Sequence, residues 1–181
     1  MTKSGNRSEE AHPIDTYLAI VSKRDLRSYR EEPVPDATVD RVLNAGRAAG
    51  SAKNRQDRRF IVLLDSQQQA AELVTRPGNV SGAALVVAIV VGEGTFASFD
   101  AARAAQNMML AAWNEGVASC PNTVVDTDAF STLLGLSESE QVAIVISFGQ
   151  PARGFDPATR SAEKWFEAAD RVPVEQAVEY R

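Results

Sequence analysis

The chain has only one histidine, His12, and one cysteine, Cys120, among its 181 residues. Ser-His-Asp triads, Cys-His pairs and zinc sites all draw on these residue types, so the sequence can hardly build any of them. A single cysteine also excludes an internal disulfide, which fits a reducing cytoplasm. If the protein is an enzyme, we therefore expect a bound cofactor, and not a side chain or a metal, to carry the chemistry.

Long hydrophobic runs are also missing. The longest unbroken apolar stretch is 83–91, which is too short to span a bilayer. The first 13 residues are polar and lack the apolar core of a signal peptide, so we predict a flexible tail over 1–13. Residues 14–181 contain no linker and predict a single domain. Membrane and secreted proteins are disfavoured, and a cytoplasmic location is expected.

Charge is unevenly distributed along the chain. The formal net charge is −5, but residues 1–60 carry +3 and residues 61–181 carry −8. The basic excess lies in two clusters, which are Lys23, Arg24, Arg27 and Arg30, and Lys53, Arg55, Arg58 and Arg59. A solvated face is one interpretation, and a site for a small anion such as a phosphate is another. Nucleic-acid binding is disfavoured because the protein is acidic and the clusters lack interleaved aromatic residues.

Hydrophobic periodicity and turn residues predict alternating helices and strands. Helices are expected over about 14–22, 36–48, 66–74, 98–115, 126–134 and 161–169. Strands are expected over 60–64, 83–91, 117–120 and 142–148, and a turn over 76–79. The apolar run at 83–91 predicts a central strand that is buried on both faces. This order indicates an α+β or α/β fold with helices on both faces of one sheet.

The helix expected over 98–115 is apolar on nearly all sides. Between Ala104 and Trp113 only Gln106 and Asn107 interrupt the apolar residues. A helix of this kind is usually buried all round. In a chain of this length, that predicts burial by a second subunit as well as by the chain's own sheet.

One segment resembles the dinucleotide-binding fingerprint of Rossmann folds. Residues 92–97 read G-E-G-T-F-A between a predicted strand and a predicted helix. The acidic residue that should follow about 20 positions later is badly placed, because Glu115 ends the helix and Asp126 lies beyond the next strand. We favour an ordinary strand-to-helix connection.

Four ordered segments resemble the nitroreductase family of flavin-dependent oxidoreductases. They are K-R-D-L-R-S-Y at 23–29, A-G-S-A-K-N-R-Q at 49–56, D-A-A-R-A-A-Q-N-M-M-L-A-A at 100–112, and G-V-A-S-C-P at 116–121. The last is continued by L-G-L at 134–136 and F-G-Q-P at 148–151, and R-V-P at 171–173 is similar to a C-terminal R-x-P of the family. The order and spacing of these segments carry the resemblance, and the chain would be a short member.

The resemblance implies an α+β fold with a mixed, mainly antiparallel sheet sandwiched by helices in a domain-intertwined homodimer. It also implies one FMN per active site at the dimer interface. The implied activity is reduction of nitroaromatics, quinones or similar small electrophiles by NAD(P)H, in a ping-pong mechanism. No catalytic side chain is implied, because the flavin carries the chemistry.

The resemblance also suggests which residues hold the flavin. Arg24, Arg27 and Arg171 would converge on the FMN phosphate, with Arg171 acting across to the partner subunit. Asp25 lies within the same motif. The remaining candidates, for the ring and ribityl chain, are Ser51, Asn54, Gln56 and the stretch Pro121, Asn122 and Thr123. Cys120 is expected to be a small buried hydrophobe.

Some positions depart from the family pattern. Asp25 stands where a small polar residue is usual, and a carboxylate beside a phosphate is unfavourable unless it points away or binds a cation. Asp57 and Arg58 replace a Pro-Trp pair, and Asn122-Thr123 replaces a turn that contains glycine. These departures leave a second hypothesis open, a flavin or deazaflavin binder, or a specialised flavin enzyme of the same fold.

Overall fold

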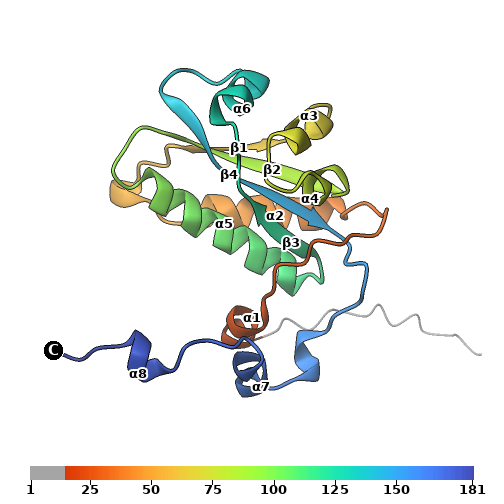
Figure 1. Cartoon of the computed structure of the whole chain (residues 1–181), viewed down its shortest axis with the longest axis vertical. Coiled ribbons are helices and arrows are strands. Elements are labelled where there is room, and N and C mark those ends of the chain that lie inside the picture. Colours follow the sequence, from red (N-terminus) through yellow and green to blue (C-terminus); the bar gives the residue numbers. More distant parts are fainter. Residues whose placement is uncertain (1–14) are drawn as a thin grey trace, which may run out of the picture.

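The computed structural model describes residues 15–181, so the flexible tail predicted over 1–13 lies outside the described part (Figure 1). The helices are α1 (Thr16–Ser22), α2 (Asp36–Ala48), α3 (Gln67–Glu72), α4 (Pro77–Ser81), α5 (Ala97–Asn114), α6 (Thr127–Leu134), α7 (Ala162–Glu167) and α8 (Val174–Ala177). Two 3-10 turns, η1 (Ala52–Asn54) and η2 (Pro157–Thr159), complete the helical elements of this part. Within residues 15–181 no helix combines the length and apolarity needed to cross a membrane.

Four strands form one sheet in the order β1-β2-β4-β3, and all neighbours are antiparallel. The strands are β1 (Arg58–Val62), β2 (Leu85–Gly92), β3 (Ala118–Asn122) and β4 (Glu140–Gly149). One isolated parallel bridge joins Asp25 to Ser119. The α+β class and the mainly antiparallel sheet are thus confirmed. A Rossmann arrangement is excluded because both neighbours of β2 are antiparallel to it, and β3, the strand after α5, does not pair with β2.

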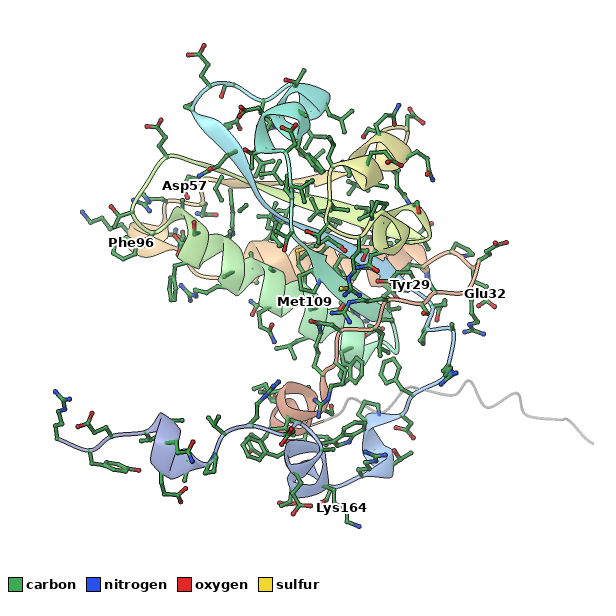
Figure 2. All side chains as sticks on the ribbon, in the orientation of Figure 1. Tyr29, Glu32, Asp57, Phe96, Met109 and Lys164 are labelled. Atoms are coloured by element: carbon green, nitrogen blue, oxygen red, sulfur yellow. The ribbon has the colours of Figure 1, made fainter. Side chains whose placement is uncertain are left out.

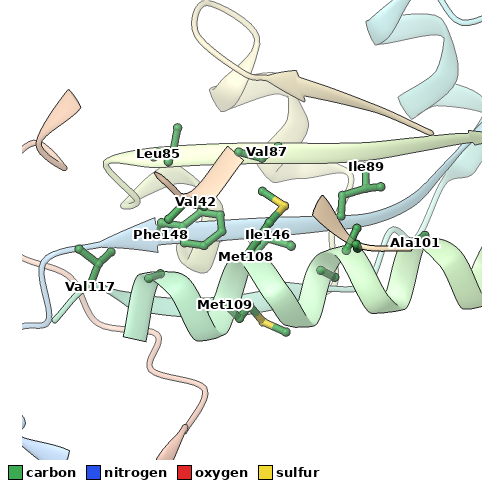
Figure 3. Close-up of a cluster of buried hydrophobic side chains, with 14 of the residues drawn as sticks. Val42, Leu85, Val87, Ile89, Ala101, Met108, Met109, Val117, Ile146 and Phe148 are labelled. Atoms are coloured by element: carbon green, nitrogen blue, oxygen red, sulfur yellow. The ribbon is translucent and has the colours of Figure 1, made fainter. Parts of the chain in front are cut away.

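Strand β2 is central and buried on both faces, as its apolar sequence predicts. Successive side chains of a strand point to opposite faces, so its residues divide between two cores. Val87 and Ile89 pack with α2 and α5, and Figure 3 shows Met108 of α5 beside them. Val86 and Val90 pack on the opposite face with residues near α3, α4 and α6. The sheet therefore lies between two helical layers (Figure 1).

Helix α5 is buried on one side only in the single chain. Ala104, Met108 and Ala112 are fully buried beneath the sheet, whereas Phe99 is 62% exposed and Gln106 is also exposed. The chain's own sheet and α2 therefore cover only part of the apolar surface that the sequence predicts to be buried.

Several element boundaries differ from the expected ones for local reasons. Pro77 begins the short helix α4 where the sequence predicts only a turn, because proline fits the first helical position. Neither Ser98 nor Asp100 caps α5, which already begins at Ala97. Strand β1 begins two residues earlier than expected, at Arg58. Its residues are mostly half-buried because β1 is an edge strand.

The C-terminal segment packs against α1 on the side of α5 away from the sheet (Figure 1). The ring of Phe155 stacks on Trp113 of α5 at a centroid distance of 3.8 Å. The indole nitrogen of Trp113 donates a hydrogen bond to Ser22 Oγ (2.9 Å). Beyond α7 the chain is exposed, and it presents the apolar side chains Val172, Val174, Val178 and Tyr180.

Candidate functional site

The motif at 23–29 forms backbone bridges to β3 and to the residues that follow β4. After α1 the backbone bridges Ser119 at Asp25 and Pro151 at Tyr29. The Tyr29 hydroxyl lies 2.9 Å from Ser147 Oγ, and burial raises the pKa of Tyr29 above its ordinary value. The segment is therefore held by backbone pairing on both sides and by a buried side-chain contact.

Gly149 makes room for Tyr29 in this contact. A Cβ at position 149 would lie 2.8 Å from Tyr29 Cγ, closer than real Cβ atoms approach. We predict that Gly149→Ala destabilises the protein by about 1–3 kcal/mol, because the ring must shift in a packed environment. Urea unfolding would measure the change. Gly154→Ala is the control, since a Cβ there meets no atom within 4 Å; an equal effect of both changes would contradict the prediction.

The carboxylate of Asp25 is paired with a cation. It forms an ion pair with Lys23, whose side chain is only 7% exposed. Lys23 Nζ also lies 3.5 Å from Met109 Sδ of α5. The departure from the family pattern is thus accompanied by a neighbouring cation that neutralises it.

This pair leads to a prediction for Asp25→Ser. Removal of the carboxylate leaves the Lys23 ammonium unpaired, so the protein without ligand should lose stability. If the site holds the FMN that the sequence resemblance implies, the carboxylate no longer repels the negative charge of FMN. FMN affinity should then rise severalfold, and FMN should raise the melting temperature more than in the wild type. Differential scanning fluorimetry with and without FMN measures both effects. Asp25→Asn separates charge from shape, and a weaker FMN affinity in both variants would refute the prediction.

Arg27 lies where two cavities meet. One, of about 190 Å³, is lined by Arg27 together with Pro121, Asn122 and Thr123 at the end of β3. The other, of about 400 Å³, is lined by 25–28 and 151–153. The structure therefore gathers Asp25, Arg27 and the 121–123 stretch around these cavities. All five residues were predicted, from one motif and one strand end that lie far apart in the chain.

The smaller cavity also contains residues that the sequence interpretation missed. Thr75, Arg76 and Asn79 line it from the segment around the start of α4. They reach it because Val74 bridges Val124, a pairing that no local pattern indicates. Arg76 in particular adds a second guanidinium to a cavity that already contains Arg27.

The Asn122 side chain is used inside the protein. Its Nδ2 donates to Cys120 O (3.0 Å) and Ser147 Oγ (3.1 Å), and its Oδ1 accepts from Asn79 Nδ2 (3.1 Å). This network connects the cavity to Ser147 and so to Tyr29. Cys120 beside it is buried, and burial raises the pKa of its thiol, so it behaves as the small hydrophobe that the sequence predicts.

Arg24 points away from Arg27, toward the C-terminal segment. It donates to Val21 O and to Trp165 O, each at 2.8 Å, and its guanidinium carbon lies 5.3 Å from the Trp165 ring centroid. Arg160 approaches the same ring at 4.9 Å. Burial, followed by the positive charges of Arg171 and Arg160, lowers the pKa of Arg24.

Arg24 and Arg160 therefore lie against the Trp165 ring, and Arg171 is near enough to Arg24 for its charge to lower the pKa of Arg24. Among residues 15–181, no carboxylate lies within ion-pair distance of any of them. Mutual repulsion without a counter-charge favours an anion between them. Arg160 was not predicted, because its position between η2 and α7 carries no motif.

The loop with Ser51, Asn54 and Gln56 is held in an unusual backbone conformation. Lys53, Asn54 and Gln56 have φ values of 54°, 54° and 55°. Ser51 Oγ accepts a hydrogen bond from the backbone N–H of Gln56 (3.0 Å). Such left-handed residues cluster at functional sites when their surroundings hold them in place.

Asp100 ties this loop to the start of α5. Its carboxylate is almost fully buried and accepts a hydrogen bond from the backbone N–H of Ala52 (3.2 Å). Arg55 and Arg103 each approach it at 4.0 Å. Asp100 lies in the first turn of α5, which begins at Ala97, and links that turn to the loop.

Apart from Arg24 and Arg171, which lie by the C-terminal segment, the predicted residues form two groups at opposite ends of the sheet. Phe148 of β4 pairs with Ser119 of β3 on one side and with Leu85 of β2 on the other. Because Ser119 bridges Asp25, the Asp25 group lies at the Leu85 end of β2. The loop at 51–56 leads into Arg58, which pairs with Val91 at the other end of β2. Six residues of strand separate these ends, or about 20 Å. Figure 2 likewise shows Asp57 and Phe96 far from Tyr29.

Comparison with known proteins gives the family. The sequence profile of the nitroreductase family matches residues 20–88 and 90–150. The chain belongs to the nitroreductase family. Among residues 15–181, no group of three or more His, Cys, Asp or Glu side chains could hold a metal ion.

Individual nitroreductase relatives agree in fold. A proposed NADH dehydrogenase/NAD(P)H nitroreductase of Methanothermobacter thermautotrophicus is 26% identical over 169 residues, covering 84% of this chain and 88% of the relative. A nitroreductase family protein from Clostridium difficile superposes with a TM-score of 0.78 at 20% identity, over 92% of this chain and 98% of its own. A proposed nitroreductase from Desulfovibrio desulfuricans, solved with FMN, has a TM-score of 0.76 at 24% identity, over 93% and 98%.

Proposed function

We propose that the chain is an FMN-dependent oxidoreductase that uses NAD(P)H to reduce nitroaromatics, quinones or similar small electrophiles. The observation that carries this proposal is the joint placement of Arg27 and the 121–123 stretch around two adjoining cavities. Family membership supports it, as do the FMN in the Desulfovibrio structure and the name of the Methanothermobacter relative. A cytoplasmic location stays a prediction.

The residues present fit FMN at both of its ends. The unpaired cations Arg24, Arg160 and Arg171 would hold the phosphate dianion, because guanidinium groups bind phosphate through paired hydrogen bonds. Arg27 and Arg76 would face the electron-rich edge of the flavin ring and stabilise negative charge there. When bound, FMN supplies hydride transfer from NAD(P)H to the acceptor in two half-reactions. No protein acid or base is needed, in agreement with the scarcity of histidine and cysteine.

We also propose that each site is completed by a second copy of the chain. The 51–56 loop lies about 20 Å along the strands from the Arg27 cavities, so one subunit does not bring both groups together. In a two-fold dimer, the loop of one subunit can approach the cavities of the other. The exposed face of α5 and the apolar side chains of residues 172–180 provide surface for such a dimer.

The absorbance spectrum of the purified protein tests the proposed function directly. A yellow protein that releases FMN on denaturation, and that NADH or NADPH bleaches rapidly, would support it. A colourless protein that binds no added FMN would overturn it. Release of a deazaflavin, or bound FMN that neither nucleotide reduces, would instead support the second hypothesis, a flavin or deazaflavin protein without this activity.

A further inference from the structure

A third cavity, of about 410 Å³, lies along the free edge of β1. Its lining is rich in cations and consists of Arg47, Gln56, Arg58, Arg59 and Phe60. It lies at the same end of the sheet as the 51–56 loop, far from the cavities at Arg27. The functions proposed above use only Gln56 of this lining and none of its arginines.

Arg58 is the unusual member of this lining. The residue is only 8% exposed, and one guanidinium nitrogen donates to the carbonyl of Ala49. The other two nitrogens, Nε and Nη1, are shielded from water and have no hydrogen-bond partner. Within residues 15–181 no carboxylate lies within 4.0 Å of this guanidinium. A buried cation in this state is costly, so it calls for an acceptor.

The neighbouring charges do not supply that acceptor. Arg59 is already paired with Glu140 at 2.7 Å, and the nearby Asp57 is paired with Arg55 at 3.3 Å. Arg47 donates to the neutral Asn44 side chain (2.7 Å). Two of the three guanidinium groups in the lining, those of Arg47 and Arg58, therefore lack a negative partner among the described residues.

A purely protective role explains only part of this cluster. Edge strands commonly carry exposed charges that prevent pairing with other chains, and Arg47 and Arg59 suit that purpose. Arg58 does not, because its charge is buried and so repels nothing at the surface. Its position is also the one where the family pattern has an uncharged tryptophan.

We propose that this cavity binds a phosphate dianion. Two unpaired guanidinium charges match the two charges of a phosphate or phosphate monoester, and their planar forks match its oxygens. Arg58 would turn its unpartnered nitrogens to the anion, while Arg47 and Gln56 approach it from the rim. The phosphate is either free or carried by a nucleotide. Gln56 also belongs to the loop assigned to the flavin, so the 2′-phosphate of NADPH is the carried form that rests on the proposed function.

Phosphate-dependent stability, compared between the wild type and variants of this cavity, tests the site without reference to flavin and separates it from the arginines near Trp165. We expect inorganic phosphate, compared with chloride at equal ionic strength, to raise the melting temperature of the wild type. In Arg58→Met the affinity derived from this shift should fall about tenfold or more. The matched control is Arg41→Met, which removes an exposed arginine of α2 outside the cavity.

Arg47→Met is a second variant, with an exposed side chain, and it should weaken phosphate binding even if Arg58→Met folds poorly. No phosphate-dependent shift in the wild type, or equal affinities in the wild type and both cavity variants, would overturn the proposal.

Steady-state kinetics then distinguishes the two sources of phosphate. If the cavity holds the NADPH phosphate, Arg58→Met should raise the KM for NADPH about tenfold and leave the KM for NADH unchanged. If phosphate binds but both KM values stay the same, the cavity is a site for the free anion. A protein that binds phosphate but no flavin would leave this site standing and overturn the flavin function instead.

Discussion

Replacement of Arg27 by methionine should lower FMN affinity about 10- to 100-fold, so that the protein is purified nearly colourless. The physical reason is the position of Arg27 between two adjoining cavities, where its guanidinium can face the electron-rich edge of a bound flavin ring. No neighbouring residue can take over this position, because the backbone on either side is fixed by the bridges at Asp25 and Tyr29. Quenching of FMN fluorescence on titration with flavin-free protein measures the affinity.

Arg30→Met is the matched control for this experiment. Arg30 belongs to the same basic cluster, but it is exposed and pairs with Glu32 at 3.3 Å. Its replacement should change FMN affinity by less than about twofold, because exposed ion pairs contribute little. If both variants bind FMN like the wild type, Arg27 has no role in the site. If both lose it equally, the loss reflects general positive charge and not the cavity.

Mixing two defective chains should restore flavin binding if each site is shared between subunits. Arg27→Met damages the cavity group, and Asn54→Ala damages the loop group at the other end of the sheet. In a heterodimer of the two variants, one site receives both damaged groups and the other receives both intact ones. With random pairing, about a quarter of all sites should be intact, although neither variant alone forms an intact site.

This experiment needs co-expression of the two chains with different affinity tags, so that heterodimers can be isolated. Isolated heterodimers should bind about one FMN per two chains with wild-type affinity. A mixture of Arg27→Met with Arg76→Met is the control, since both residues line the same cavity and no site becomes intact. Absence of recovery in the first mixture, with dimers present, would show that each chain uses only its own residues.

Local sequence signals predicted those elements whose formation depends on neighbouring residues. The helix predicted over 126–134 is observed as α6, which Asp126 caps and Gly135 ends in a left-handed conformation (φ 60°). The continuous apolar run at β2 predicts its central position, because only a strand covered on both faces tolerates such a run. By contrast, the sequence predicts a turn at 76–79, since a five-residue helix has too few residues for a periodic pattern.

The candidate site also contains residues that the sequence predicts and residues that it does not. The motif at 23–29 and the stretch at 121–123 could be predicted from the order of short motifs along the chain. Their meeting at one cavity depends on the bridge between Asp25 and Ser119, which joins residues 94 positions apart. Arg76 was missed for this reason, because only the pairing of Val74 with Val124 brings it there.

Composition and short ordered motifs are sufficient to predict an α+β chain of the nitroreductase family that lacks the side chains for triad or zinc chemistry. The directions of the arginine side chains follow only from the three-dimensional structure. Arg24 turns to Trp165, Arg27 to the cavities, and Arg58 into the edge of the core without a counter-charge. Side-chain direction depends on packing between distant segments, and neighbours in sequence do not encode it.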